Sequence, residues 1–319
     1  MTQGIRFREY RLSDIPAFVE IANRVYPDDP NTVENEEYFE RIYPPDNPRL
    51  RYAVENSAGQ LIGGGTCILP FWQYAPGVYM MWITLDPDWR RRGIGRAMLD
   101  KFETFARQQG AERLRTDCRE DMAYSIEFLK AMGFTNFGLR YESELDLKSF
   151  DESKFGNAVD RAIAAGYEFT TLTTERTINP EADRLLYDVD RVTRDDVPMP
   201  GGTRSRSSYE DFRRINLESP ESDPSAIFIA KHDDQYVGHT MVWFGKDKPA
   251  YTAMTGVQRE HRGHNLALAL KLLSFRLMKE RGYSATRTTN DTANPPILRL
   301  NEKLGYQKIP GNSLWEKVL

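Results

Sequence analysis

Residues 90–97 read Arg90-Arg91-Arg92-Gly93-Ile94-Gly95-Arg96-Ala97, between an apolar run at 78–85 and an amphipathic pattern at 94–109. The apolar run predicts a buried strand, and the amphipathic pattern predicts a helix. The first turn of a helix has unpaired backbone N–H groups and a partial positive charge, both of which suit an anion. Glycine lets the anion approach because it has no Cβ, and arginine adds positive charge. The segment therefore predicts a diphosphate-binding turn, although either feature alone also fits a solvated surface.

The same arrangement recurs 172 residues later, as Arg262-Gly263-His264-Asn265-Leu266-Ala267-Leu268-Ala269. It again follows an apolar run, at 251–257, and precedes a helical pattern, at 266–281. Further landmarks keep the offset of 172 without a gap: Gly110 and Gly282, Arg115-Thr116 and Arg287-Thr288, and Gly133-Phe134 and Gly305-Tyr306. A fixed period of this kind is the signature of a repeated structural unit. The repetition favours an anion site over a solvated surface.

The chain therefore divides into two α/β domains, which we place at 1–150 and 151–319. In each copy we expect a first strand and helix, an antiparallel pair, a buried strand, the turn and its helix, a further strand and helix, and a last strand that closes the copy. The expected first elements of the second copy are a strand at 169–172 and a helix at 179–189. Residues 151–165 predict one connecting helix, capped by Asp151 and stopped by Gly166.

Composition restricts the function classes. The chain has 319 residues, enough for two domains, and a formal net charge of −4 with a pI near 5.8. Proteins that bind nucleic acid are normally basic, so we expect no nucleic-acid partner. The charged N-terminus and the lack of an apolar run of ~18 residues predict no signal peptide and no membrane span. The two cysteines, Cys67 and Cys118, are not spaced for a zinc site or a disulfide framework and fit a reducing compartment, so we expect a cytoplasmic monomer or homodimer without a metal.

The turn resembles the signature of the Gcn5-related N-acetyltransferase (GNAT) family, Gln/Arg-x-x-Gly-x-Gly/Ala, between the family's fourth strand and third helix. Arg90-x-x-Gly93-x-Gly95 matches it fully, and Arg262-x-x-Asn265-x-Ala267 departs only at Asn265. Asparagine tolerates left-handed backbone angles, so the second turn can keep its shape. Residues 255–271 are similar to the second halves of two-domain members related to mycothiol synthase. A dinucleotide fingerprint is disfavoured because Met98 stands at its third glycine.

The resemblance implies two tandem GNAT folds, each a mixed, mostly antiparallel twisted sheet flanked by helices, with a V-shaped split between strands 4 and 5. It also implies acetyl-CoA as co-substrate, with its diphosphate on the turn and its pantetheine arm in the split. The implied cofactor-binding residues in the first copy are Ile83, Thr84, Leu85, Arg90, Arg91, Arg92, Gly93, Ile94, Gly95 and Arg96. Those in the second copy are Val257, Arg262, Gly263, His264, Asn265, Ala267, Asn294 and Asn301. His261 and His264 are interpreted as phosphate contacts, a base or solvated surface residues.

The implied reaction is transfer of acetyl to a primary amine of a small molecule or peptide by direct attack. Family members often carry an asparagine on the second helix and, seven residues later, an acidic tyrosine. The corresponding residues are Met122 and Leu129 in the first copy and Asn294 and Asn301 in the second. Because both copies lack that tyrosine, a catalytically idle CoA-binding sensor or scaffold is the alternative.

The candidate bases are Asp117 and Glu120, which also fit ordinary surface carboxylates. Tyr124 is a weak substitute for the missing acid, and its position also fits core packing. Residues 26–48 and 192–208 read as irregular segments, where we expect substrate specificity to arise.

Overall fold

The computed structural model describes residues 4–319 except 74, 199–200, 202–206 and 292–293. The elements of the first half are β1 (Arg6–Glu9), η1 (Leu12–Asp14), α1 (Ile15–Val25), α2 (Val33–Ile42), β2 (Arg49–Glu55), β3 (Leu61–Ile68), β4 (Val78–Leu85), η2 (Pro87–Trp89), α3 (Ile94–Gln108), β5 (Arg113–Arg119), α4 (Ala123–Ala131) and β6 (Thr135–Asp146). The strand, turn and helix predicted around residue 90 are therefore confirmed as β4, the η2 turn and α3.

The second half repeats this order with an added pair of short helices at its start. Its elements are η3 (Glu152–Phe155), α5 (Ala158–Ala164), β7 (Glu168–Thr171), α6 (Leu172–Ile178), α7 (Ala182–Arg194), α8 (Tyr209–Phe212), the π-helical turn η5 (Arg213–Leu217), β8 (Ser222–His232), β9 (Gln235–Trp243), β10 (Ala250–Val257), η6 (Arg259–His261), α9 (Leu266–Glu280), β11 (Ala285–Asp291), α10 (Pro295–Leu304) and β12 (Gln307–Val318). None of the described helices combines the length and apolar character that crossing a membrane requires.

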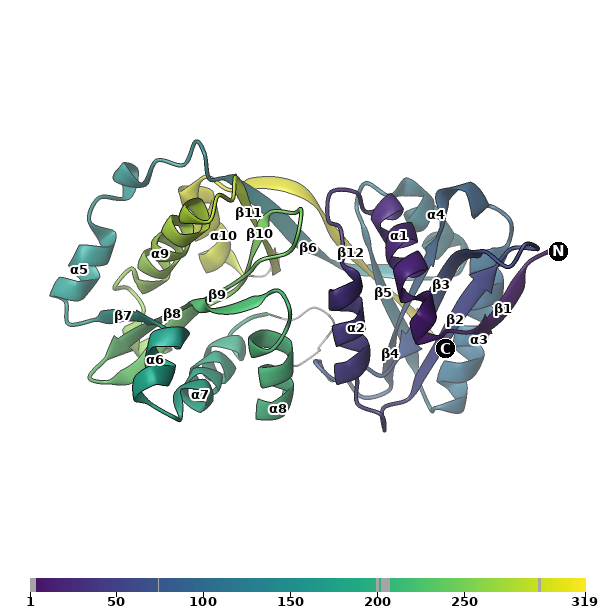
Figure 1. Cartoon of the computed structure of the whole chain (residues 1–319), viewed down its shortest axis with the longest axis horizontal. Helices are drawn as coiled ribbons and strands as arrows, with labels where there is room; N and C mark the ends of the chain where they lie inside the picture. The colour runs from purple at the N-terminus through teal and green to yellow at the C-terminus, as the bar shows by residue number, and fades with distance from the viewer. Residues whose placement is uncertain (1–3, 74, 199–200, 202–206, 292–293) are drawn as a thin grey trace.

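The last strands of the two halves are exchanged. The strands form one sheet in the order β1-β2-β3-β4-β5-β12-β6-β11-β10-β9-β8-β7. β12 from the end of the chain pairs antiparallel with β5, from Asn312 opposite Arg119 to Val318 opposite Arg113. β6 pairs with β11 in the same way, and β6 and β12 pair with each other. Figure 1 shows both strands running between the halves.

The prediction that each copy closes its own sheet is therefore wrong, although both copies have the expected mixed, mostly antiparallel pairing. β5 and β11 hold equivalent places in the two copies, and each pairs with the last strand of the other copy. The boundary predicted at residue 150 does not separate two sheets, because the strands of both halves form one sheet. Each half depends on a strand that the other half supplies.

Three local predictions need correction. Residues 151–165 form two short helices, η3 and α5, because Gly156 adopts φ 54° and ψ −151° between them. The helix predicted at 179–189 corresponds to α7, which begins at Ala182 and continues to Arg194, and a further helix, α6, precedes it with its start capped by the Thr171 side chain. The segment 26–48 contains α2, whose N-terminus is capped by Thr32. Part of the segment 192–208 lies outside the described residues.

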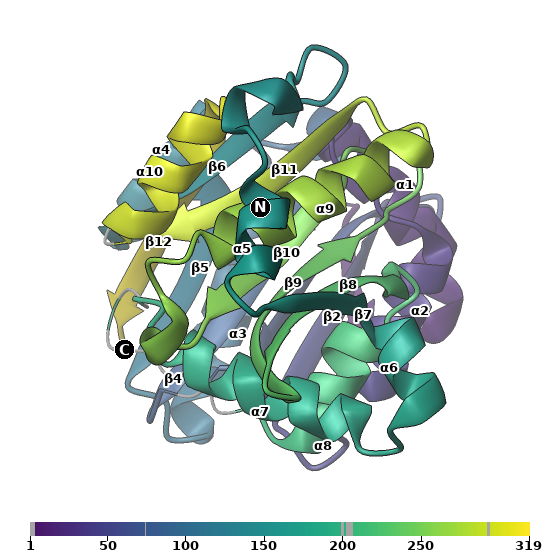
Figure 2. The same cartoon turned by 90° about the vertical axis from the view of Figure 1, so that its left-hand side faces the viewer.

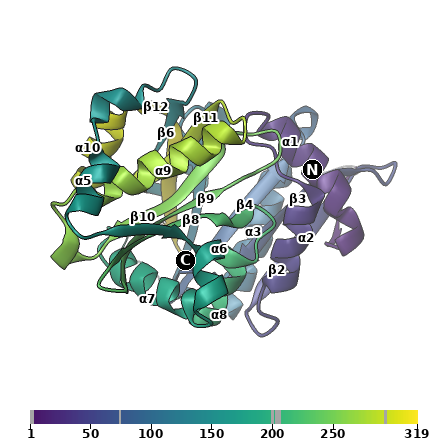
Figure 3. The same ribbon diagram turned by 60° about the vertical axis from the view of Figure 1, so that its left-hand side comes forward.

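Helices cover both faces of the sheet in each half. α9 and α10 lie on one side of the C-terminal strands, with α6, α7 and α8 on the other (Figures 2 and 3). The core of the first half is built around α3, with Met98, Leu99 and Phe102 fully buried. The halves also touch directly, because the Tyr38 hydroxyl on α2 donates to the Arg214 carbonyl at 2.6 Å. The two copies are therefore held against each other.

The exchange gives a stability prediction. Trp315 of β12 is 4% exposed and lies within the core of the first half. Trp315→Ala removes a large side chain from that core, so we expect the free energy of unfolding to fall by about 3–5 kcal/mol in denaturant titrations. Val318, on the same strand but 70% exposed, is the matched control, and Val318→Ala should change it by about 0.5 kcal/mol or less. Equal small losses in both variants would contradict the observed packing.

Candidate functional site

The site begins where two parallel strands separate. In the first half, β4 and β5 pair only from Val78 opposite Arg113 to Met80 opposite Arg115, and then diverge. In the second half, β10 and β11 pair only at Ala250 and Tyr251. The carboxyl-terminal parts of these strands therefore have edges with free backbone groups. The V-shaped split predicted for both copies is present.

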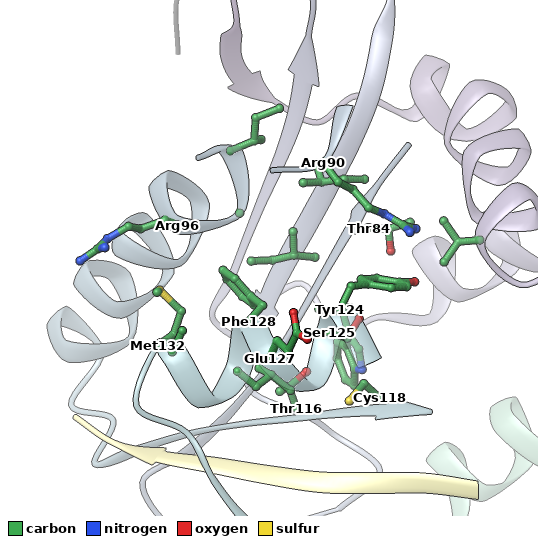
Figure 4. A pocket seen from close by; sticks show the side chains of 18 of the residues that line it. Thr84, Arg90, Arg96, Thr116, Cys118, Tyr124, Ser125, Glu127, Phe128 and Met132 are labelled. Carbon is green, nitrogen blue, oxygen red and sulfur yellow. The ribbon is translucent and has the colours of Figure 1, made fainter. Parts of the chain in front are cut away.

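A cavity of about 440 Å³ fills the split of the first half, between β4, β5, the start of α3, and α4 (Figure 4). Most of the predicted cofactor-binding residues of this copy line it: Ile83, Thr84, Leu85, Arg90, Arg91, Gly93, Ile94, Gly95 and Arg96. Arg92 does not line it, because its guanidinium lies 4.4 Å from the centre of the Trp89 ring and donates to the Asp88 carbonyl. The sequence thus placed the turn correctly but not the direction of this side chain.

The turn has the shape that an anion requires. Gly93 adopts φ 77° at the N-cap of α3, and an added Cβ would meet nothing within 4 Å. The first helical bond runs from the Ala97 N–H to the Gly93 carbonyl, so the N–H groups of residues 94–96 have no helical acceptor. Gly95 has a different role, since a Cβ there would lie 3.3 Å from the Phe128 ring. Gly93 therefore shapes the turn, and Gly95 allows α4 to pack against α3.

The cavity wall combines positive charge at its mouth with apolar side chains inside. The Arg90 guanidinium lies 4.0 Å from the centre of the Tyr124 ring, and Figure 4 shows the two side chains together. Arg91 at the surface pairs with Glu127 at 2.9 Å. A helix start for a diphosphate, a free strand edge for an extended amide arm and an apolar interior together fit coenzyme A.

Asp117 lies where this cavity meets a second one. Its carboxylate accepts a hydrogen bond from the Trp82 indole N–H at 3.0 Å. Burial raises the pKa of this carboxyl above its ordinary value, and the Trp82 hydrogen bond opposes that shift. Asp117 lines both the 440 Å³ cavity and a larger cavity of about 910 Å³ between the halves. We call the larger one the central cavity.

Glu120, the other candidate base, lies elsewhere. Its carboxylate accepts the Gly311 backbone N–H at 2.8 Å, and its own backbone N–H donates to the Gly311 carbonyl. Gly311 belongs to β12, so Glu120 anchors the exchanged strand. Glu120 does not line either of the two cavities.

Several residues of the first cavity have no signal in the motif. Tyr26, at the end of α1, is brought to the cavity by tertiary structure alone, and burial raises its pKa to about 12. Tyr124 and Phe128 lie on the inner face of α4, and Met132, at its C-cap, continues the helical spacing. That spacing is a usable signal, although it also describes core packing.

The second copy keeps the shape of the turn, but the arginines at its turn are already paired. Asn265 adopts φ 59° at the N-cap of α9, so the left-handed turn expected there is present. The Arg262 guanidinium donates to the Val257 carbonyl at 3.1 Å and pairs with Asp196, which also binds Arg259. A single carboxylate thus already binds both arginines at this turn.

The other residues predicted in the second copy are dispersed. Asn294 lines the central cavity, whereas Val257, Gly263, His264 and Ala267 do not. Asn301 is 3% exposed, and neither polar atom of its side chain has a hydrogen-bond partner among the described residues. The His264 ring lies 5.4 Å from that of Tyr167, and His261 Nδ1 lies 3.2 Å from the Tyr167 hydroxyl.

Comparison with known proteins gives consistent results. The model of the acetyltransferase (GNAT) family matches residues 15–134 and 189–306. The mycothiol acetyltransferase of Thermomonospora curvata is 26% identical over 227 residues, which span 71% of this chain and 69% of that protein. N-alpha-acetyltransferase 30 of Schizosaccharomyces pombe is 26% identical over 134 residues, 41% of this chain and 83% of that protein.

Two solved structures share the whole fold. The tandem GNAT protein from the clavulanic acid biosynthesis pathway has a TM-score of 0.75 at 21% identity, covering 98% of each chain. A GCN5-related N-acetyltransferase from Sphaerobacter thermophilus has a TM-score of 0.69 at 17% identity, covering 98% of this chain and 95% of that one. At these identities the likeness concerns the fold. Because the family model matches both halves and most of the chain, this protein belongs to the GNAT acetyltransferase family, whose acyl donor is acetyl-CoA, and it contains two copies of the family's domain.

Proposed function

We propose that this acetyltransferase holds acetyl-CoA in the cavity of the first half and acetylates a primary amine, on a small molecule or peptide, that enters through the central cavity. One observation carries the proposal: Asp117 lines both cavities. A group in this position can face the donor and the acceptor together, which a transfer between two substrates requires.

The residues around the first cavity supply the donor site. The free N–H groups at the start of α3 and the side chain of Arg90 would bind the diphosphate, and the free edge of β4 would bind the pantetheine arm. Acetyl-CoA supplies an activated acetyl group and a thiolate leaving group. We assign no donor site to the second copy, because Asp196 already pairs with Arg259 and Arg262 there.

Asp117 would remove the proton from the amine. An amine is mostly protonated near neutral pH and must lose its proton before it can attack. The raised pKa of Asp117 brings this carboxylate closer to the pKa expected of an effective base, and the Trp82 hydrogen bond fixes its orientation. Tyr26, which keeps its proton at neutral pH and lines the same cavity, is available to protonate the thiolate.

An idle CoA-binding sensor is the second candidate, favoured by Leu129 at the position of the family's usual acid. A thiol-release assay with acetyl-CoA over a panel of amines separates the two. We expect turnover with at least one amine. Tight acetyl-CoA binding without thiol release across the panel would instead support the sensor.

The proposal predicts an acidic limb in the pH profile. Asp117 acts as a base only when it has lost its proton, so kcat/KM should fall as the pH is lowered through its pKa. Because burial raises that pKa, the midpoint should lie above the 3.8 of an ordinary aspartate. The measurement is initial rate against pH with acetyl-CoA saturating and the acceptor well below its KM. A profile without this limb in a fully folded enzyme would exclude Asp117 as the base.

A further inference from the structure

We propose that the central cavity binds a carboxylate beside the side chain of Lys271, so that the acceptor is an amine that also carries a carboxylate group. This inference rests on the proposed function, because it assigns the chemical class of the acceptor. The carboxylate end would lie in the split of the second half, and the amine end would reach Asp117 of the first half.

Lys271 is a charged residue in a core position. It lies on α9, is 1% exposed and lines the central cavity. The equivalent residue of the first copy, 172 positions earlier, is Leu99, which packs in the core. The fold therefore accepts an apolar side chain here, and packing alone does not require a lysine.

The ammonium group of Lys271 has no counterion within the described chain. It forms no hydrogen bond or ion pair with any described residue, and the ring of Tyr306 lies 5.2 Å away. Burial lowers the pKa of this amine to about 7. A buried cation is costly unless it is paired, so an anion beside it would stabilise the charged form.

Two further donors line the same cavity. Asn290 Nδ2 and Trp243 Nε1 line it and are buried without a hydrogen-bond partner among the described residues. Asp190, a carboxylate of the cavity, is already bound to Arg194 and His239. The cavity therefore offers hydrogen bonds to a ligand that brings its own acceptors.

A carboxylate fits this environment better than a phosphate. Beside Lys271 the ligand meets one positive charge, and a carboxylate carries one negative charge. A phosphate monoester carries about −1.5 to −2 near neutral pH, which is more negative charge than Lys271 alone neutralises. The cavity of about 910 Å³ is large enough for an amino acid that extends from Lys271 toward Asp117.

The test compares each acid with its own carboxamide, which keeps the shape and removes the charge. The acceptors are β-alanine, γ-aminobutyrate and L-lysine with their carboxamides, assayed by thiol release from acetyl-CoA. The proteins are the wild type, Lys271→Leu, which restores the residue of the first copy, and Lys303→Leu, which changes an exposed lysine on α10. We expect the wild type and Lys303→Leu to favour the acids roughly tenfold or more in kcat/KM, and Lys271→Leu to lose that preference.

Two outcomes would overturn the inference and leave the proposed function standing. The first is acetylation of the carboxamides as efficiently as the acids by the wild type. The second is a preference for O-phosphoethanolamine over β-alanine. If none of these amines is acetylated, the inference is tested by calorimetry, which compares the binding of N-acetyl-γ-aminobutyrate with that of its amide. Tighter binding of the acid that Lys271→Leu removes supports the inference, and equal binding of acid and amide refutes it.

Discussion

Replacing Gly93 by aspartate should abolish acetyl-CoA binding. The substitution places a negative group at the start of α3, where residues 94–96 offer free N–H groups to a diphosphate. Repulsion between like charges brought into contact costs several kcal/mol, so we expect affinity to fall at least roughly 100-fold, or about 2.7 kcal/mol. Isothermal titration calorimetry should find about one equivalent of acetyl-CoA per wild-type chain and none for Gly93→Asp.

Two further variants serve as controls. The first distinguishes the effect of charge from that of backbone strain, and the second distinguishes the first copy from the second. Gly93→Asn adds a side chain at φ 77° without charge, and the second copy already has asparagine at the equivalent position. We expect it to bind acetyl-CoA with a much smaller loss than Gly93→Asp. Asn265→Asp introduces the same negative charge at the equivalent turn and should leave the binding of acetyl-CoA unchanged. If Gly93→Asp kept its affinity for acetyl-CoA, or if Asn265→Asp lost one bound equivalent of acetyl-CoA, the donor site would not be confined to the first half.

The turn was predictable because its causes are local. The apolar strand, the left-handed glycine and the amphipathic helix are adjacent in the sequence. Each can be recognised from its own residue pattern without knowledge of the rest of the fold. The 172-residue offset then transferred the prediction to Asn265, which adopts the expected left-handed angles. Arg92 shows the limit of this reasoning, since the motif does not reveal that its side chain turns toward Trp89.

The exchange of β6 and β12 was not predictable for the opposite reason. β5 and β11 hold equivalent places in the two copies, and their pairing with β12 and β6 joins segments far apart in the sequence. The same holds for Tyr26 and Lys271, whose positions in the cavities follow from tertiary packing. Lys271 did leave one usable signal, because the repeat aligns it with the buried Leu99.

Replacing Asp117 by asparagine should reduce kcat roughly 10²–10⁴-fold, the usual contribution of a general base. Asparagine has the same shape and can still accept the hydrogen bond from Trp82, but it cannot take a proton near neutral pH. The affinity for acetyl-CoA should therefore persist while the chemical step is lost. The measurements are kcat from thiol release and the dissociation constant of acetyl-CoA from calorimetry on the same preparation.

Glu120→Gln is the matched control, because Glu120 lies near the end of β5 and bonds β12 rather than lining either cavity. It should change stability more than kcat, and it should keep the acidic limb of the pH profile that Asp117→Asn removes. Adding small exogenous bases such as imidazole should partly restore Asp117→Asn if proton removal is what it lacks. A folded Asp117→Asn enzyme with near-normal kcat would show that solvent takes the proton. Asp117 would then line the two cavities without acting as the base.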